Sequence, residues 1–209
     1  KIIIMIFYFA KKSVSLAAHI VLEESGATYE TIEIDFAVTE QRSDKYLKIN
    51  PKGRVPALAT DDGIITETPA ILAYVAQTNP ASKLAPINNP YLFAKCQEFN
   101  LYLCSTVHVA HAHRVRGNRW AEDEKSILSM KNKVAQNMSD YFELIESELF
   151  VGPWVLGDEY SICDAYLFTI AQWLKGDGVA LSKFPILSDF EIRMRNREAV
   201  KRIISIYKV

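Results

Sequence analysis

The spacing of hydrophobic and polar residues changes character after about the first third of the chain. Before that point, short apolar runs alternate with segments of helical periodicity. Ile2–Phe9 is a continuous apolar run, which is typical of a strand buried on both faces. Residues 14–25 repeat apolar side chains at helical spacing and are followed by Gly26, a common residue after a helix. Tyr29–Ile34 alternates as a second strand, so this segment predicts a β-α-β unit.

A hairpin and a further helix are expected next. Val55–Ala59 has the composition of a strand, Asp61-Asp62-Gly63 that of a turn, and Ile64-Ile65 that of the returning strand. Thr68 and Pro69 predict a helix start, with the threonine as N-cap and the proline in the first helical position. The sheet is therefore expected to mix parallel and antiparallel strands.

Residues 79–90 contain three prolines and three asparagines and predict a linker. Every segment beyond it has helical periodicity, including residues 123–149 and 161–175. The first of these helices carries an apolar stripe at intervals of three and four residues, formed by Leu92, Cys96, Phe99, Leu103, Val107 and Ala110.

The expected architecture is thus a small α/β domain followed by an all-α domain. We place the first domain at residues 1–78, the linker at 79–90 and the helical domain at 91–209. The chain has 209 residues, which is long enough for both domains to bury a core.

Composition narrows the possible partners. The chain is 49% hydrophobic and 23% charged, and its formal net charge is −1. A near-neutral balance does not favour nucleic acid or an anionic membrane as partner. The longest apolar run, Ile2 to Ala10, is too short to span a bilayer.

The cysteines indicate a reducing environment. Cys96, Cys104 and Cys163 form no CxxC pair. On one helix, Cys96 and Cys104 would lie roughly 12 Å apart along the axis, which exceeds the reach of a disulfide. We therefore expect reduced and mostly packed thiols, and a cytoplasmic location.

Four stretches together resemble the cytosolic glutathione transferases along essentially the whole chain. Asn50–Leu58 resembles the stretch around that family's cis-proline, and Glu67–Ile71 resembles its glutathione-holding turn. Ser161–Ala165 resembles the helix-capping box of its second domain. Ser15–His19 with Leu22-Glu23-Glu24 is similar to the bacterial, beta-like branch. The resemblance implies a thioredoxin-like glutathione-binding domain, a helical domain that binds an electrophile, and a homodimer.

The resemblance also implies a set of glutathione-binding residues. A cis bond before Pro56 would let Val55 present its N–H and C=O to the cysteinyl unit as an antiparallel ladder. Thr68, at a helix N-terminus, suits the γ-glutamyl carboxylate, and Glu67 suits the ammonium. Lys52 is a candidate partner of the glycyl carboxylate.

Each of these residues also has a simpler interpretation. Val55 and Pro56 can merely end a turn and begin an edge strand. Thr68 can act only as an N-cap, and Glu67 only as a favourable charge near a helix dipole. Lys52 can be a solvated surface lysine.

The corner after the first strand is the candidate catalytic site. Bacterial members resembling this chain often have a cysteine just before the Ser-Leu-Ala stretch, and here that position is Val14. Ser13 matches the serine of serine-type transferases, and Tyr8 the tyrosine of tyrosine-type members. We expect Ser13 to stabilise the glutathione thiolate, with Tyr8 second and Ser15 third. Ser13 as a plain N-cap and Tyr8 as a core residue are the alternatives.

His108 allows three interpretations. Cys104, His108 and His111 share one helix face, but no fourth ligand is evident in the sequence, so we expect no metal. By resemblance, His108 lies in the electrophile pocket, although it can also be a polar residue without a role. Arg114 and the two arginines that follow form either a solvated helix end or a rim that attracts anionic substrates.

The expected function is transfer of glutathione to a small hydrophobic electrophile. Ser161 and Asp164 are expected to fold the helical domain as a capping box, not to catalyse. The alternative to an enzyme is a non-catalytic relative that binds ligands or other proteins, because a fold does not determine a function.

Overall fold

A computed structural model of the chain describes residues 5–208. Residues 2–4 of the expected first strand therefore lie outside the described part. The described residues form two compact units, one containing the residues up to Ala94 together with those from Arg195 onward, and the other containing Lys95–Met194. No helix in the described part is long and apolar enough to cross a membrane.

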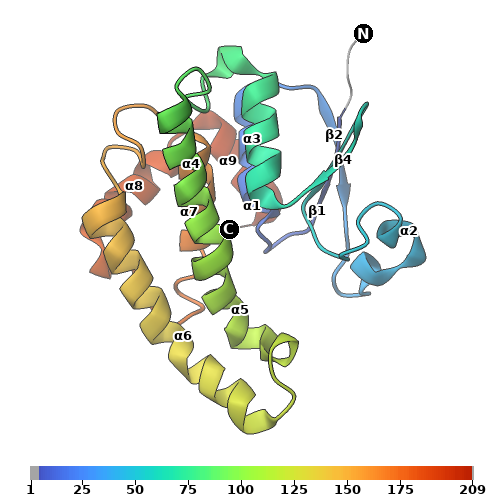
Figure 1. Cartoon of the computed structure of the whole chain (residues 1–209), viewed down its shortest axis with the longest axis vertical. Coiled ribbons are helices and arrows are strands. Elements are labelled where there is room, and N and C mark those ends of the chain that lie inside the picture. Colours follow the sequence, from blue (N-terminus) through green and yellow to red (C-terminus); the bar gives the residue numbers. More distant parts are fainter. Residues whose placement is uncertain (1–4, 209) are drawn as a thin grey trace. The chain divides into compact units, whose positions relative to one another are not determined.

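The first unit is built around a four-stranded mixed sheet of order β2-β1-β3-β4 (Figure 1). Strand β1 (Met5–Phe9) runs parallel to β2 (Tyr29–Glu33) and antiparallel to β3 (Ala57–Thr60). Strand β4 (Gly63–Thr66) returns antiparallel to β3. The expected mixture of parallel and antiparallel pairs is confirmed.

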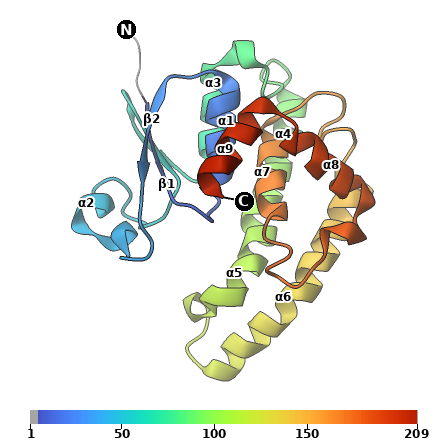
Figure 2. The same cartoon turned by 180° about the vertical axis from the view of Figure 1, so that it is seen from behind.

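Helices cover both faces of this sheet. Helix α1 (Ser15–Ser25) and helix α3 (Thr68–Thr78) lie on one face, and the short α2 (Asp44–Leu47) lies on the other (Figures 1 and 2). Helix α1 ends at Gly26, which adopts the left-handed conformation with φ +69° and donates its N–H to the Glu23 carbonyl. The predicted end of this helix is confirmed.

The last helix, α9 (Glu198–Tyr207), packs on α1 and belongs to the first unit. Arg197 holds Glu24 with two hydrogen bonds of 2.6 and 3.0 Å, and Arg202 donates to Glu23 at 2.6 Å. The sequence placed residues 195–209 in the helical domain because periodicity reports helical structure and not the packing partner. These ion pairs and the apolar face of α9 attach the segment to α1 instead.

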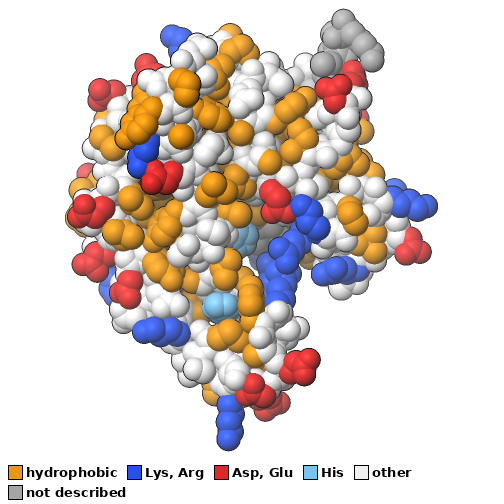
Figure 3. All heavy atoms as spheres, viewed as in Figure 1, with side chains coloured by type: hydrophobic (Ala, Val, Ile, Leu, Met, Phe, Trp, Pro, Cys, Tyr) orange, Lys and Arg blue, Asp and Glu red, His pale blue; other side chains and the backbone are white. Residues whose placement is uncertain are grey.

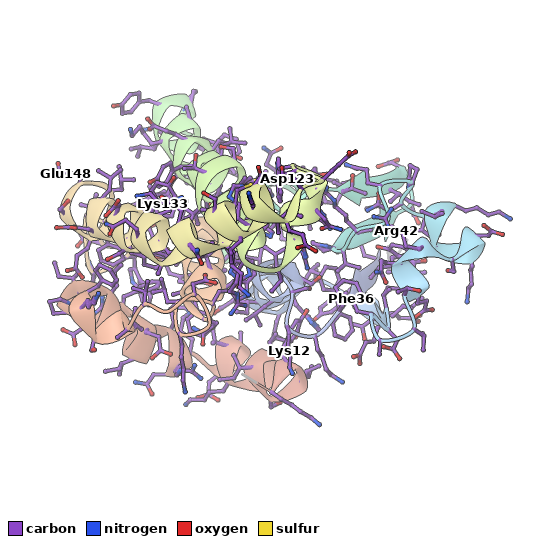
Figure 4. All side chains as sticks on the ribbon, turned by 90° about the horizontal axis from the view of Figure 1, so that it is seen from below. Lys12, Phe36, Arg42, Asp123, Lys133 and Glu148 are labelled. Carbon is purple, nitrogen blue, oxygen red and sulfur yellow. The ribbon has the colours of Figure 1, made fainter. Side chains whose placement is uncertain are left out.

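The second unit is helical. Its main helices are α4 (Pro90–Tyr102, which begins in the first unit), α5 (His108–Arg116), α6 (Glu124–Leu144), α7 (Ile162–Ala171) and α8 (Pro185–Arg195). A π-helical turn, Leu103–Val107, joins α4 to α5, and another, Ile145–Leu149, ends α6. Figure 4 follows α6 along its length, from Asp123 at its start through Lys133 to Glu148.

The predicted apolar stripe of the α4–α5 segment is buried except at its first position. Cys96, Phe99 and Leu103 are buried, as are the two stripe residues that follow. Leu92 is exposed, because it lies in the first turn of α4 and does not reach the core.

Helix α7 is the centre of the second unit, and all its residues are buried. The predicted capping box is present: Asp164 accepts the Ser161 N–H at 2.7 Å, and Ser161 Oγ accepts the Cys163 N–H at 3.2 Å. Asp164 also accepts the N–H of Val155 at 2.8 Å. Three hydrogen bonds, including one at 3.0 Å from Ser161 Oγ to the carboxylate, compensate the buried charge, so this residue is structural.

The sulfurs of Cys96 and Cys163 lie 3.3 Å apart, although the two residues are far apart in the sequence. Both residues are fully buried, and none of the three cysteines forms a disulfide. Burial raises the pKa of the Cys163 thiol well above its ordinary value. This thiol is therefore protonated and packed in the core.

Candidate functional site

The corner between β1 and α1 is held by the Ser13 hydroxyl. Ser13 Oγ lies 2.7 Å from the Ala10 carbonyl oxygen and 2.9 Å from Ser15 Oγ, and it accepts the Ser15 N–H at 3.1 Å. The hydroxyl thus satisfies one of the first N–H groups of α1, as an N-cap does. Its half-buried position leaves it accessible to a ligand at this corner.

Val14 precedes α1 directly and is buried. It has no side-chain group that could stabilise a thiolate. In the part of the chain that the structure describes, its N–H has no acceptor, and it lies where the helix dipole is positive. Lys12, in the same corner, has a positive φ of +56° and is labelled in Figure 4. The corner therefore offers a backbone donor and a hydroxyl to an anion.

Tyr8 lies on the opposite face of the sheet from its neighbours in β1. Phe7 and Phe9 point toward α1, where both rings pack against His19. Tyr8 instead packs on the α2 side, with its ring 5.9 Å from that of Tyr46 in an edge-on contact. It is half-buried and packs against a core cluster that includes Tyr46 and Val55, as the alternative interpretation as a core residue expects.

The segment before Pro56 is fixed by two side chains acting on one carbonyl. The Arg54 carbonyl accepts the Tyr46 hydroxyl at 2.7 Å and the side-chain amide of Asn50 at 2.6 Å. Burial raises the pKa of Tyr46 to about 12, so this hydroxyl remains a donor. The bond between Val55 and Pro56 is cis, as expected.

Gly53 is required by the same segment. Its φ is +59°, and a Cβ placed there would lie 2.9 Å from both Arg42 Nη1 and the Gln41 carbonyl oxygen. Arg42 is labelled in Figure 4, in the segment before α2. A side chain at position 53 would therefore displace the backbone that leads to Val55.

The start of α3 differs from the sequence-based expectation. The N-cap is Glu67, with φ +74°, and Thr68 is already the first helical residue. A non-glycine residue with such a φ is uncommon, and this backbone is imposed by the surrounding fold. The N–H groups of Thr68 and Ala70 have no acceptor inside the helix, so they can bind an anion there. Pro69 has no N–H, and Ile71 donates its N–H to the Glu67 carbonyl.

Lys52 and Glu67 are brought together, although the sequence assigned them to different ends of a ligand. Lys52 Nζ lies 2.5 Å from Glu67 Oε1, and both side chains are about half exposed. The ion pair joins the loop before Val55 to the start of α3. Thr68 itself is buried.

Three residues that fix the 50–56 loop were not predicted from the sequence. Asn50 and Tyr46 bond to the backbone of the 50–56 loop, Gly53 lies within it, and Tyr46 also packs in one apolar cluster with Val55. The available signal was the Asn-Pro-Lys-Gly turn, since a buried asparagine in a turn usually bonds to nearby backbone. Tyr46 gave no comparable signal.

In the second unit, His108 lies beside Trp173, with ring centroids 4.8 Å apart. His111 stacks on the same indole at 4.2 Å and donates its Nδ1–H to Asp177. Cys104 belongs to the same helical segment. Among the described residues, no group of three histidine, cysteine or acidic side chains has the arrangement of a metal site.

Both units match domains of one protein family. Residues 5–77 match the glutathione S-transferase N-terminal domain, and residues 119–198 match the C-terminal domain of the same family. The chain belongs to the glutathione S-transferase family. Glutathione S-transferase GstA of Escherichia coli is 30% identical over 96% of this chain and 98% of its own length. Maleylacetoacetate isomerase of Pseudomonas aeruginosa is 26% identical, over 86% of this chain and 85% of its own.

Solved structures of glutathione transferases share the fold. A glutathione transferase homologue from Sulfitobacter, solved with bound glutathione, is 40% identical and superposes with a TM-score of 0.94 over 99% of both chains. The bacterial transferase BphK, solved as a ternary complex, is 31% identical with a TM-score of 0.85, over 98% of this chain and all of its own. The thioredoxin-like domain and the helical domain expected from the sequence are thus those of this transferase family.

Proposed function

We propose that this transferase binds glutathione at the β1–α1 corner and activates its thiol to attack an electrophilic hydrophobic small molecule. The observation that carries the proposal is the presence of all glutathione-binding candidates in one compact unit, together with the likeness to a homologue with bound glutathione. The corner supplies a group that can stabilise an anion. The 50–56 loop supplies backbone N–H and C=O groups for an extended peptide, and α3 supplies a helix N-terminus.

Each end of glutathione has a partner of suitable chemistry. Thr68 offers its N–H and hydroxyl at the start of α3, where the helix dipole favours the γ-glutamyl carboxylate. Glu67 offers a carboxylate to the ammonium of the same unit, and Val55 its backbone to the cysteinyl unit. Lys52 would turn from Glu67 to the glycyl carboxylate, or bridge the two.

Ser13 stabilises the thiolate in this proposal. A free thiol has a pKa near ~8.5, and lowering it by two units requires about 2.7 kcal/mol. A helix N-terminus supplies roughly 0.3–1 kcal/mol and a hydrogen bond to a charged group about 1.5–3. Both effects act at the Ser13 corner, whereas Tyr8 packs on the α2 side of the sheet without a helix N-terminus. Tyr8 is the second candidate.

The proposal extends to the second substrate and the assembly. His108, beside Trp173, is assigned to the pocket for the electrophile. The chain is proposed to work as a homodimer in the cytoplasm, in detoxification, with its cysteines reduced and no metal. The homodimer is supported by exposed apolar side chains along α4, namely Tyr91, Leu92 and Leu101.

Two measurements test the activity. The protein should be retained on immobilised glutathione and eluted by free glutathione, and it should conjugate glutathione to an aryl halide such as chlorodinitrobenzene. Retention without turnover on several electrophiles would favour the non-catalytic ligand-binding relative. Absence of both would contradict the proposed function.

A further inference from the structure

A group of charged and aromatic side chains in the second unit is not used by the glutathione site. His108, His111 and Arg114 follow one another at intervals of three residues along α5. Trp173 and Asp177 come from the segment after α7, and the two sets are in contact. Figure 3 shows histidine side chains that reach the surface among hydrophobic ones.

Asp177 organises the group. Its side chain is fully buried. His111 donates its Nδ1–H to the carboxylate, with Nδ1 at 2.9 Å from Oδ1 and 2.8 Å from Oδ2. Arg114 Nε lies 3.1 Å from Oδ1 of the same carboxylate. Because a buried carboxylate is stable only when paired, these contacts fix the orientation of both basic side chains.

Arg114 also lies against the backbone of Gly176. A Cβ at position 176 would overlap with Arg114 Nη1, so the guanidinium lies directly on the glycine backbone. Contact with Gly176 and the ion pair with Asp177 both limit where the guanidinium can lie. A guanidinium that is already ordered loses less conformational freedom on binding an anion.

The hydrogen-bonding capacity of the group is not exhausted within the chain. Donation from Nδ1 to Asp177 leaves Nε2 as the remaining nitrogen of His111, whose side chain is 13% exposed. Arg114 Nε forms an ion pair with Asp177 at 3.1 Å without a hydrogen bond, and the side chain is 33% exposed. None of the described residues accepts a hydrogen bond from its terminal nitrogens. The group thus offers His111 Nε2 and the terminal nitrogens of Arg114 to solvent or to a ligand.

Trp173 provides a flat apolar surface beside these nitrogens. The His111 ring stacks on it at 20° with centroids 4.2 Å apart, and the His108 ring approaches it at 4.8 Å. Half-buried aromatic surface next to fixed donors is typical of a small-molecule site.

We propose that His111, Arg114 and Trp173 bind a planar aromatic or conjugated monocarboxylic acid. The carboxylate accepts from the terminal nitrogens of Arg114 and lies beside His111 Nε2, while the conjugated part of the ligand packs on the exposed indole surface. Asp177 is a positioning residue that holds both donors. As a description of the second substrate, this inference rests on the proposed function, but the binding site itself does not.

The charges favour a monoanion. His111 and Arg114 are two basic side chains against the single carboxylate of Asp177, so the group suits a ligand with one negative charge. A phosphate dianion would leave an excess negative charge beside the buried carboxylate of Asp177. The planar fork of Arg114 also matches the two oxygens of a carboxylate.

The test measures binding to the whole protein in the absence of glutathione. The probe is para-nitrobenzoate, whose ring quenches indole fluorescence on contact, and the comparison ligand is para-nitrobenzamide, which has the same shape without the charge. We expect saturable quenching by the acid and affinity about tenfold lower for the amide. Equal affinity for the two ligands would overturn the proposal without any variant.

Variants locate the site. Trp173→Phe should abolish most of the quenching, and Arg114→Gln should weaken binding of the acid about tenfold while leaving the amide unchanged. The chain offers a matched control, because Arg193 packs over Trp154 at 5.8 Å in the same unit. Arg193→Gln and Trp154→Phe should leave the affinity and the quenching of the acid as in the parent protein. If the control pair has the larger effect, the proposed site is wrong.

The result can be separated from the activity test. Failure of para-nitrobenzoate to bind would overturn this site while retention on glutathione and turnover of a neutral aryl halide still supported the transferase. Conversely, quenching that depends on Arg114 and Trp173 supports the site even where turnover is absent. If quenching is unchanged in Trp173→Phe, the group only attaches the segment after α7 to α5.

Discussion

The Ser13 hydroxyl has one proton and already has acceptors for it within the protein. In the free enzyme this proton points to the Ala10 carbonyl or to Ser15 Oγ. To donate to a glutathione thiolate it must turn away from both, and a thiolate at the helix start attracts it more strongly than a neutral oxygen does.

The first prediction concerns this hydroxyl. Ser13→Ala should raise the pKa of bound glutathione by about one to two units, because a hydrogen bond to a charged group contributes about 1.5–3 kcal/mol. The measurement is thiolate absorbance against pH at saturating glutathione. Tyr8→Phe and Ser15→Ala are the comparison variants. An unchanged value in Ser13→Ala with a rise in Tyr8→Phe would assign the role to the tyrosine.

The second prediction compares two glycines of similar φ. At Gly26 (φ +69°) an added methyl group would have no heavy atom within 4 Å, whereas at Gly53 (φ +59°) it would meet Arg42 and the Gln41 carbonyl. Gly26→Ala should cost about 1 kcal/mol from backbone conformation alone. Gly53→Ala should cost more, by roughly 1–3 kcal/mol, and should also weaken glutathione binding, since it displaces the loop before Val55.

Chemical denaturation and glutathione titration of both variants give the comparison. Equal losses of stability, with glutathione affinity intact in Gly53→Ala, would mean that the close approach at Gly53 does not position the site.

Single residues also mark where prediction from sequence succeeds and where it stops. Gly26 and Asp164 were predictable because a left-handed helix end and a capping box depend on residues within one turn. Glu67 was assigned correctly to the start of α3, but its role as N-cap was not, because a positive φ is uncommon for a glutamate and no residue in its own segment predicts it. The His111–Asp177 contact joins residues 66 positions apart, and no local pattern reports it.

At the scale of elements, the pairing of α1 with α9 places a histidine in an apolar environment. His19 is buried between the rings of Phe7, Phe9, Tyr29 and Tyr207. Its Nδ1 is 3.4 Å from the Tyr207 hydroxyl. Burial lowers the pKa of His19 to about 4, and the charge of Glu23 opposes that shift only partly.

The third prediction follows from this shift. The unfolded chain binds a proton at His19 below pH about 6.5, whereas the folded chain does so only below about 4. The contribution to stability is therefore fully present above pH 6.5 and is lost as the pH falls toward 4, by about 3 kcal/mol in total. Denaturation curves at several pH values in this window measure the loss.

His19→Leu should remove this part of the pH dependence. Glu23 does not produce the same signal: burial disfavours its charge, but hydrogen bonds from Arg202 and Tyr29 outweigh that effect and lower its pKa below 4.5, so its contribution is lost only at lower pH. If the free energy of unfolding of the parent protein falls between pH 6.5 and 5 by no more than that of His19→Leu, the neutral buried state of His19 is contradicted.

The placement of α9 shows the limit of periodicity at this scale. The sequence predicts that residues 198–207 are helical and amphipathic, but it does not say which surface covers the apolar face. That choice depends on Glu23 and Glu24, which are adjacent on α1 and meet Arg202 and Arg197. Both acidic residues precede the arginines by more than 170 positions.

At the scale of the whole molecule, sequence patterns predicted two kinds of domain, and the family comparison supports both. Helix and strand periodicities are local properties, so the architecture was accessible from the sequence. The residues that line a pocket for the electrophile could not be predicted from the sequence, because the lining of such a pocket depends on how side chains of several helices pack. The second substrate is therefore inferred from contacts such as that of His111 with Trp173.

The last prediction concerns assembly. Leu101 on α4 is 54% exposed, and Leu128 and Leu144 on α6 are exposed as well. Large apolar side chains exposed on two helices of one unit are typical of an interface between subunits. Sedimentation at micromolar concentration should give about twice the chain mass of 23.7 kDa.

Leu101→Lys should shift the mass toward that of one chain, because it places a charge in the interface. Ile192, on α8, is exposed to a similar extent at 57%, and Ile192→Lys should leave the mass unchanged. A parent protein that sediments as a single chain would contradict the homodimer, and equal effects of the two lysines would place the interface elsewhere.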